Sequence, residues 1–400
     1  MFKGFPYVTR RVYCDAASTT PPSRRVRCAL RKVHGVFGNP SSIHKEGVRA
    51  RDILHTMRTR VAKVVGVRVN EIIFTGSGTE SNNIAIQGFI NDLVEKGFAL
   101  NGLHVITSAL EHSSVLKPLR ALEQKGLKVT YLDGAPDGVI REQNIRKSLT
   151  ENTALVVLSY VNSEVGTISY IQKIGAHLRA IRLKRVEEGN NVPLMFHLDA
   201  SQAPLYLPLD VERLYVDSMT LDGHKIGGPK GIACLAIRDR INLSPIIYGG
   251  GQEKGLRPGT EPLGLIVGFT SALEEAQKGS EERSIRVKKV RDELLRLISK
   301  ELPEAVINGS LERRVANNIN ISIPGIDPEF VVLKMDAHGV AISTKSSCLK
   351  GEEESYVVFA LSKDHERART TLRFTFLQNA SIRDARRVFQ VLKRAVTPRV

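Results

Sequence analysis

The chain has 400 residues, a formal net charge of +16 and four cysteines, and these properties exclude several classes of protein. Its content of 42% hydrophobic and 25% charged residues is ordinary for a globular protein in water. No apolar run approaches the roughly 18 residues that a membrane span needs, and the basic N-terminal segment lacks the apolar stretch of a secretory signal. We therefore expect a cytoplasmic protein with no membrane segment and with two or three domains.

The excess of positive charge raises the question of nucleic-acid binding, but its distribution argues against that partner. Lys and Arg are scattered along the chain, Trp is absent, and no DNA- or RNA-binding signature is present. We expect a solvated basic surface, suited to an acidic protein partner, and no direct contact with nucleic acid. The cysteines include no Cys-x-x-Cys pair, so we expect reduced thiols and no metal site.

Between about residues 60 and 240, short β-branched runs alternate with longer amphipathic stretches. This alternation is typical of an α/β domain with a mostly parallel sheet, whose ligands gather at the carboxyl ends of the strands. The predicted helices include 116–125 and 174–187. The predicted strands are 71–75, 104–108, 129–132, 154–161, 194–198, 218–220 and 232–237.

The composition changes after residue 240, where a Gly-rich, polar stretch at 248–260 predicts a long functional loop. A long helix is predicted over 263–300, interrupted near Gly279, and it is followed by strands at 317–323 and 372–376 and a final helix at 382–395. We expect a large domain of residues 15–262. Residues 1–14 and 263–400 are expected to form a smaller α+β domain.

Two charged side chains stand at the ends of neighbouring predicted strands. Asp199 follows the apolar run 194–198, and Lys225 follows the next strand in the segment Asp222-Gly223-His224-Lys225. Such a pair suits pyridoxal 5′-phosphate (PLP), because the lysine forms the Schiff base and the acid pairs with the protonated pyridine nitrogen. A structural Asp–Lys salt bridge explains the same two residues equally well.

A third motif favours the cofactor. The segment Gly76-Ser77-Gly78-Thr79 follows the predicted strand 71–75 and opens an amphipathic helix. Backbone N–H groups and the helix dipole at such an N-terminus attract anions such as phosphate. Ser or Thr at this position is by itself only a helix cap. With an acid and a lysine at neighbouring strand ends, a phosphate cradle explains the segment better.

From about Val12 to near its C-terminus, the chain resembles the cysteine desulfurases, which belong to the class V branch of the fold-type I PLP enzymes. The motifs that carry this resemblance are Tyr13-Cys14-Asp15-Ala16-Ala17-Ser18-Thr19-Thr20-Pro21, Phe37-Gly38-Asn39-Pro40-Ser41-Ser42, Thr79-Glu80-Ser81-Asn82, Glu111-His112, Val161-Asn162-Ser163-Glu164-Val165-Gly166, His197-Leu198-Asp199, Gly223-His224-Lys225 and Gly228-Pro229-Lys230-Gly231. The resemblance implies a large domain with a mostly parallel mixed sheet flanked by helices, a smaller C-terminal domain, and a homodimer.

The resemblance also implies how the cofactor is held. Lys225 bonds PLP covalently and moves the substrate Cα proton. Asp199 pairs with the pyridinium, Gln202 bonds the ring hydroxyl, and His112 stacks on the ring and assists proton transfer. The residues implied to bind the phosphate are Gly78, Thr79, His224 and, from the other subunit, Thr260. A packed histidine is the plainer interpretation of His112.

Substrate binding and the reaction rest on a second group of residues. The resemblance implies that Arg373 binds the carboxylate of L-cysteine through its planar guanidinium, and that Asn162 or Ser163 lines the substrate side of the ring. Arg373 is otherwise a surface arginine. Cys348 lies in the polar segment 345–354, which predicts an exposed loop, and its position matches the family nucleophile that accepts sulfur as a persulfide. A cysteine placed in that loop by chance is the alternative.

The chain departs from the family pattern at three positions. Asp222 stands where a serine is usual, and a carboxylate there repels phosphate unless it turns away or bonds a backbone amide. Ser163 replaces an asparagine. Lys345 replaces a glycine ahead of Cys348, and we hypothesise that its charge lowers the pKa of the Cys348 thiol; identical thiol titrations of the wild type and Lys345→Ala would exclude this.

The leading hypothesis is an L-cysteine desulfurase that supplies persulfide to an acceptor protein for iron–sulfur cluster assembly or tRNA thiolation. The alternatives are another class V PLP enzyme, such as a selenocysteine lyase or an aminotransferase, and a non-catalytic interaction protein on a decayed scaffold. Cys348 at the nucleophile position favours the first hypothesis.

Overall fold

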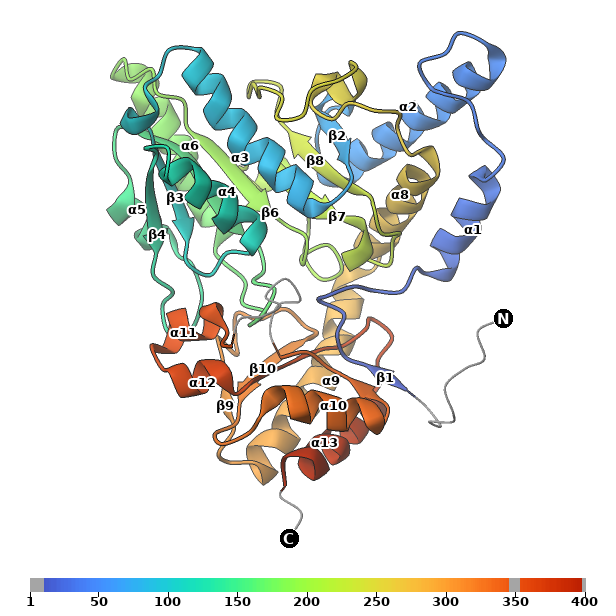
Figure 1. The fold of residues 1–400 in the computed structure, drawn as a ribbon, viewed down its shortest axis with the longest axis vertical. Helices are drawn as coiled ribbons and strands as arrows, with labels where there is room; N and C mark the ends of the chain where they lie inside the picture. Colours follow the sequence, from blue (N-terminus) through green and yellow to red (C-terminus); the bar gives the residue numbers. More distant parts are fainter. Residues whose placement is uncertain (1–10, 345–352, 398–400) are drawn as a thin grey trace.

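The computed structural model describes residues 11–344 and 353–397. Its larger part is built on a seven-stranded sheet with helices on both faces (Figure 1). In spatial order the strands are β2 (Ile72–Thr75), β8 (Ala233–Ile237), β7 (Ser218–Asp222), β6 (Met195–Asp199), β5 (Thr153–Ser159), β3 (His104–Ser108) and β4 (Lys128–Leu132).

The sheet is mostly parallel, which confirms the expected fold class. Strand β8 pairs antiparallel with both β2 and β7, and the other neighbouring strands pair parallel. Strands β5 and β6 are buried along nearly their whole length, because helices cover both of their faces. This burial explains why the two strands appear in the sequence as continuous apolar runs.

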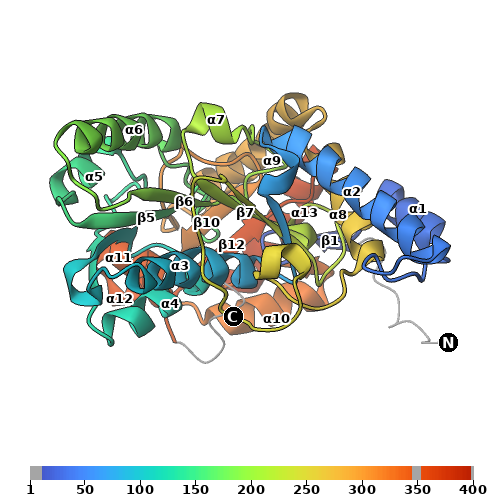
Figure 2. The same ribbon diagram turned by 90° about the horizontal axis from the view of Figure 1, so that it is seen from above.

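Two layers of helices cover the two faces of the sheet (Figure 2). On one face, α3 (Gly78–Glu95) and α4 (Ser113–Glu123) contribute Ile84 and Leu119 to a buried hydrophobic cluster that includes Val105 of β3. On the other face, α6 (Ile171–Glu187) contributes Leu178 to a second cluster, which includes Phe196 of β6. The remaining helices of this part are α1 (Arg24–Val33), α2 (Lys45–Val65), α5 (Glu142–Ser148), α7 (Val211–Leu214) and α8 (Leu263–Gln277).

The smaller part contains an antiparallel sheet in the order β12 (Thr371–Thr375), β10 (Asn318–Ser322) and β9 (Val306–Ile307). Near the N-terminus, β1 (Val12–Tyr13) pairs parallel with β11 (Val340–Ala341). The predicted long helix is two helices, α8 and α9 (Ser280–Glu301), separated at Gly279, whose φ of 66° is left-handed. The other helices are α10 (Pro328–Ala337), α11 (Tyr356–Ser362), α12 (His365–Arg369) and α13 (Ile382–Val396).

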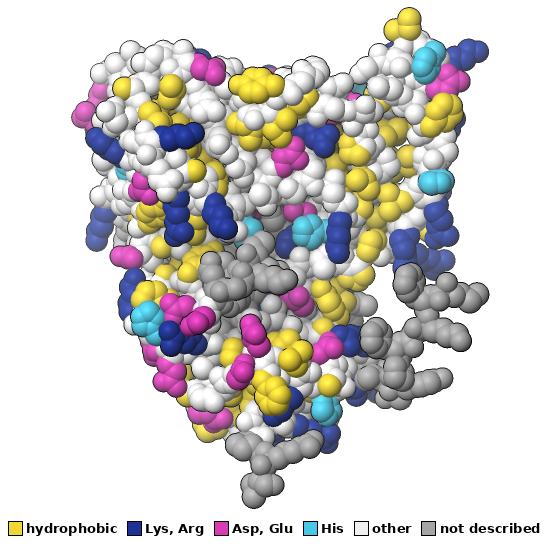
Figure 3. All heavy atoms as spheres, in the orientation of Figure 1, with side chains coloured by type: hydrophobic (Ala, Val, Ile, Leu, Met, Phe, Trp, Pro, Cys, Tyr) yellow, Lys and Arg dark blue, Asp and Glu magenta, His cyan; other side chains and the backbone are white. Residues whose placement is uncertain are grey.

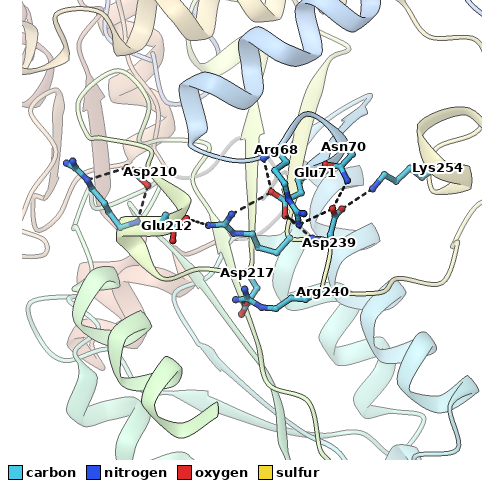
Figure 4. A network of polar contacts seen from close by, with 11 residues as sticks. Arg68, Asn70, Glu71, Asp210, Glu212, Asp217, Asp239, Arg240 and Lys254 are labelled. Atoms are coloured by element: carbon cyan, nitrogen blue, oxygen red, sulfur yellow. Dashed lines mark hydrogen bonds and ion pairs between the residues drawn. The ribbon is translucent and has the colours of Figure 1, made fainter. Parts of the chain in front are cut away.

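A network of ion pairs lies at the edge of the large sheet where the parallel strands begin (Figure 4). Asp217, directly before β7, is fully buried and pairs with Arg182 and Arg240. Beside β2, the buried Glu71 and the more exposed Asp239 both pair with Arg68, at 3.0 Å each. Each acid of this network therefore has a cationic partner, as buried charges require.

The described surface agrees with the predicted scatter of charge. On the face drawn in Figure 3, basic and acidic side chains are interspersed rather than gathered into one stripe. Among the described residues, no helix is both long enough and apolar enough to cross a membrane, and no cluster of His, Cys, Asp and Glu is arranged to hold a metal ion.

Candidate active site

The carboxyl ends of five strands meet around one cavity of about 200 Å³. Polar side chains are placed there because β2, β3, β5, β6 and β7 all end at this edge. The lining residues are Ala17, Ser18, Ser77, Gly78, Thr79, His112, Ser114, Ser159, Val161, Ser163, Asp199, Ser201, Gln202, Asp222, His224, Lys225 and Arg373. The fold thus brings together most of the residues that the sequence singled out.

Asp199, the last residue of β6, is a buried carboxylate whose bonds come from neutral groups. Its Oδ2 accepts a hydrogen bond of 2.8 Å from Asn82 Nδ2, and its Oδ1 accepts bonds from the amide and hydroxyl of Ser201 at 3.0 and 2.7 Å. In the described part of the chain, no Lys, Arg or His forms an ion pair with Asp199. A buried anion without a cation is costly, so this carboxylate suits a ligand that brings positive charge.

A chain of polar side chains behind Asp199 fixes its orientation. Asn82 Oδ1 accepts a hydrogen bond from His197 Nε2 at 3.0 Å, and His197 Nδ1 lies 2.7 Å from the hydroxyl of Ser218. His197 is fully buried, and burial lowers its pKa, although the charge of Asp199 opposes this. The imidazole is therefore neutral at physiological pH, and it positions Asn82 without neutralising Asp199.

Lys225 lies across the cavity, in a 3-10 turn (Gly223–Lys225) that follows β7. Its Nζ donates to the backbone oxygens of Ala17 and Ser18, at 2.7 and 2.8 Å. Among the described residues, Lys225 does not form a salt bridge with Asp199. The interpretation of these two residues as a structural Asp–Lys ion pair is therefore not what the structure shows. The N-terminal segment around Ser18 is therefore a wall of the site, a role that the sequence analysis did not assign to it.

The motif Ser77-Gly78-Thr79, which the sequence analysis expects to hold a phosphate, lies at the N-terminus of α3 and lines the cavity. Ser77 caps the helix by accepting from the Glu80 amide at 3.1 Å. The amide of Gly78 donates to Asp222 Oδ2 at 2.9 Å, and Asp222 Oδ1 lies 2.7 Å from His224 Nδ1. Asp222 thus bonds a backbone amide, one of the two arrangements that the sequence allowed for it.

His112 is the N-cap of α4, and its ring lines the cavity. Its Nδ1 lies 2.8 Å from the hydroxyl of Ser114. The preceding residue, Glu111, is buried and accepts a hydrogen bond from the hydroxyl of Ser159. Burial, reinforced by the nearby charge of Asp199, raises the pKa of Glu111 to about 7, so this carboxyl holds a proton up to neutral pH.

Arg373 in β12 reaches the cavity from the smaller part of the molecule. It is not the surface arginine of the plainer interpretation, because only 1% of it is exposed. Its Nη2 donates to Asp15 at 2.9 Å and to the hydroxyl of Ser18 at 2.8 Å, and its Nη1 donates to the carbonyl of Ser163 at 3.1 Å. Its buried Nε has no hydrogen-bond partner in the described residues.

Four further residues named from the sequence have distinct placements. Gln202 lines the cavity, and its Nε2 donates to the carbonyl of Ala17 at 2.9 Å. Asn162 does not line it, because its amide bonds the carbonyl of Leu110 and the amides of the turn that follows. Thr260 is exposed and outside the cavity lining. Cys348 and its neighbour Lys345 lie outside the described residues.

Several lining or supporting residues were not identified from the sequence: Asp15, Asn82, Ser114, Ser159 and Ser201. Small polar residues are common throughout the chain, so their type carried no signal. Asp15 lies in a motif that the sequence analysis quoted, but its contact with Arg373 joins residues 358 positions apart. Only the folded chain brings these two residues together.

The residues around the cavity fit PLP. Asp199 is a buried anion suited to a pyridinium nitrogen, and Lys225 is the amine for a Schiff base. The start of α3 supplies backbone N–H groups and a positive dipole for a phosphate. A Cβ at Gly78 would lie 3.0 Å from Asp222 Oδ2 and 3.3 Å from Ser201 Oγ, so a larger residue there would require these side chains to shift.

This fold and site define a PLP-dependent enzyme, and comparison with known proteins gives its family. The sequence model of the Aminotransferase class-V family matches residues 12–388. The chain therefore belongs to this family, as the resemblance predicted.

Its relatives include proteins named cysteine desulfurase IscS. The chain is 35% identical to the one from Dictyoglomus turgidum, with 97% of this chain and 95% of the relative covered, and 38% identical to the one from Ehrlichia chaffeensis, with 91% and 85% covered. A solved structure of a NifS-like protein superposes with a TM-score of 0.85 at 30% identity, covering 96% of this chain and 99% of the other.

Proposed function

We propose that the protein is an L-cysteine desulfurase, which converts L-cysteine to L-alanine and passes the sulfur to Cys348 as a persulfide. The observation that carries the proposal is that Lys225, His112 and the buried Arg373 face one cavity, because an amine, a ring base and a guanidinium together suit an α-amino acid substrate. The similarity of nearly the whole chain to proteins named cysteine desulfurase supports the same substrate.

PLP, when bound, supplies an electron sink for the Cα–H electrons of the substrate. Arg373 holds the substrate carboxylate, and Lys225 takes the Cα proton with its Nζ and returns a proton later. His112 moves a proton at the ring face. Asp199 keeps the pyridine nitrogen protonated, which makes the sink effective.

In the sulfur step, the Cys348 thiolate attacks the substrate sulfur. The S–S bond of a persulfide forms as the substrate Cβ–S bond breaks, and the electron pair of that bond goes to Cβ, which takes up a proton and leaves as the methyl group of alanine. No external oxidant is needed, because the alanine carbon is reduced as the sulfur is oxidised. The persulfide sulfur then passes to an acceptor protein for iron–sulfur cluster assembly or tRNA thiolation.

We propose further that the enzyme is a cytoplasmic homodimer, with residues 15–262 as the large domain and residues 1–14 and 263–400 as the small one. Thr260, which is exposed in one chain, would bind the cofactor phosphate of the partner subunit. Gln202 would bond the ring hydroxyl and Ser163 would line the substrate side. Asn162 would support this side indirectly, through the turn that its amide stabilises.

The test is the formation of alanine and sulfide from L-cysteine, measured with a thiol reductant present. The wild type should form both in equal amounts, and Cys348→Ser should lose both while keeping the visible absorbance of bound PLP. Cys28→Ser, which removes an exposed thiol from α1, is the matched control and should keep full activity. Faster release of selenium from L-selenocysteine than of sulfur from L-cysteine, or transamination without sulfide, would assign another class V activity.

A further inference from the structure

The phosphate end of the cavity contains a carboxylate, which is unexpected where an anion binds. Asp222, at the end of β7, is 5% exposed. Its Oδ2 accepts the Gly78 amide at 2.9 Å, and its Oδ1 accepts the His224 amide at 3.2 Å. Asp222 therefore already occupies one backbone donor at the start of α3, where an anion would otherwise bind.

This carboxylate is ionised at neutral pH. Burial alone would raise its pKa, but the bonds from His224 and from the Gly78 amide outweigh burial and hold the pKa below its ordinary value. A cofactor phosphate bound beside it therefore meets a fixed negative charge. Two like charges in one site are unfavourable unless a cation lies between them.

The side chain that lies beside Asp222 and can carry a positive charge is that of His224. Its Nδ1 lies 2.7 Å from Asp222 Oδ1, and 24% of its side chain is exposed. A hydrogen bond to a carboxylate fixes the proton on Nδ1, so Nε2 is the ring nitrogen left for the phosphate, and it donates only when the ring is protonated. Lys225 cannot serve as this cation in the loaded enzyme, because its amine is consumed by the bond to PLP.

We propose that Asp222 is a positioning residue that holds His224 as a cation, so that the cofactor phosphate binds together with a proton on His224. A neutral residue at position 222 would release the Gly78 amide and remove the need for this proton. Asp222 and His224 thus form a unit: the acid fixes the imidazole, and the imidazolium separates the acid from the phosphate.

Other ionisable groups lie around the cavity, and the test must separate their effects from that of His224. They are His112, Asp199, Lys225 and Arg373 in the lining, and Glu80, which contacts Arg257 at 3.4 Å beside the cradle. Pyridoxine 5′-phosphate is a suitable probe, since it carries the ring and phosphate of PLP but has no aldehyde to react with Lys225. Pyridoxine, which lacks the phosphate, reports the contribution of the ring alone.

The experiment is a calorimetric titration of the full chain, freed of cofactor, with each probe between pH 7 and 9, where the phosphate is already a dianion. For the wild type, the affinity for pyridoxine 5′-phosphate should fall as pH rises, approaching about tenfold per pH unit, the slope for uptake of one proton. For Asp222→Ser, the slope should be much smaller, and binding at pH 9 should be tighter than in the wild type. Pyridoxine should bind both proteins alike.

A double-mutant cycle tests the coupling directly. His224→Gln should weaken phosphate binding strongly when Asp222 is present and only slightly in the Asp222→Ser background. Glu80→Gln, which removes a different carboxylate from the first turn of α3, is the matched control and should leave the pH slope unchanged. Asp222→Asn keeps the shape of the side chain and replaces Asp222→Ser if the serine variant does not fold.

Two results would overturn the proposal: pH slopes that coincide for the wild type and both Asp222 variants, or equal losses on His224→Gln in both backgrounds. Weaker binding by the Asp222 variants at every pH would also contradict it, because Asp222 would then be only a support for the cradle. These measurements use cofactor binding alone, so their outcome is independent of whether the enzyme desulfurates cysteine.

Discussion

The two ends of the large sheet carry buried carboxylates in opposite electrostatic states. At the end where the parallel strands begin, Asp217 is neutralised by Arg182 and Arg240 and also accepts the Phe196 amide at 2.7 Å. At the other end, the hydrogen bonds that Asp199 accepts from the described residues come from amide and hydroxyl groups. A carboxylate with its own cations stabilises the fold, whereas one without them is available to a cationic ligand.

The same contrast holds for the surrounding groups. The acids of the network in Figure 4 have arginine or lysine partners within the chain. At the active end, Glu111 is buried beside Asp199, and its pKa is raised. Within the described residues, Glu111 has no ion pair, and the buried Nε of Arg373 has no hydrogen-bond partner. The two ends of the sheet therefore treat their buried carboxylates differently: one supplies cations, and the other leaves Asp199 and Glu111 without an ion pair in the described part of the chain.

The sharpest way to break this contrast is Asp217→Ala. It leaves Arg182, whose side chain is only 20% exposed, without its partner, and it removes the bond to the Phe196 amide. We expect the free energy of unfolding to fall by about 3–5 kcal/mol, measured by urea denaturation. PLP bound to the remaining folded protein should keep the wild-type absorbance, and a change in that absorbance would mean that the two ends are not independent.

Asp199→Asn tests the opposite end. Because it removes the acid proposed to pair with the pyridine nitrogen, we expect kcat to fall about 100-fold, equivalent to about 2.7 kcal/mol of barrier. The cofactor-free protein should unfold within about 1 kcal/mol of the wild type, since Asp199 gives up no ion pair. A larger loss of stability than of activity would place Asp199 with Asp217 among the structural acids.

Glu111→Gln sharpens the comparison through pH. The pKa of Glu111 is raised to about 7 in the folded protein, from 4.5, so its favourable contribution is present below pH 4.5 and is lost as pH rises through 7. The variant should be more stable than the wild type at pH 8, by about 2–3 kcal/mol, and equal to it near pH 4.5. Denaturation curves at both pH values measure this, and a difference that is constant with pH would disprove it.

The smallest effect is expected at the exposed rim of the network in Figure 4. Lys254, with 49% of its side chain exposed, lies 3.3 Å from Asp239. Lys254→Gln should change the free energy of unfolding by less than about 0.5 kcal/mol, because exposed ion pairs contribute little. Equal effects of Lys254→Gln and Asp217→Ala in the same denaturation assay would show that burial does not decide the strength of this network.

Much of the fold could be predicted from local pattern. The expected strand 104–108 is β3, and the break at Gly279 falls between α8 and α9, because apolar periodicity and glycine act over a few residues. The ends were less accurate: the strand expected over 218–220 continues to Asp222. The strand continues there because Leu221 and Asp222 pair with Cys234 and Ala233 of the neighbouring β8, a contact that local pattern does not show.

The sequence by itself determined which kinds of residue form the site: a lysine and an acid after neighbouring strands, and small residues at the start of a helix. The motifs around these residues also identified the family. The sequence could do so because these groups lie at strand ends whose order is visible in the chain. Only the tertiary structure decided how they are used. Asp222 bonding Gly78, Asp15 pairing with Arg373 and Asn162 being committed to its own turn all depend on contacts between distant segments or on exact side-chain orientation, which residue pattern does not encode.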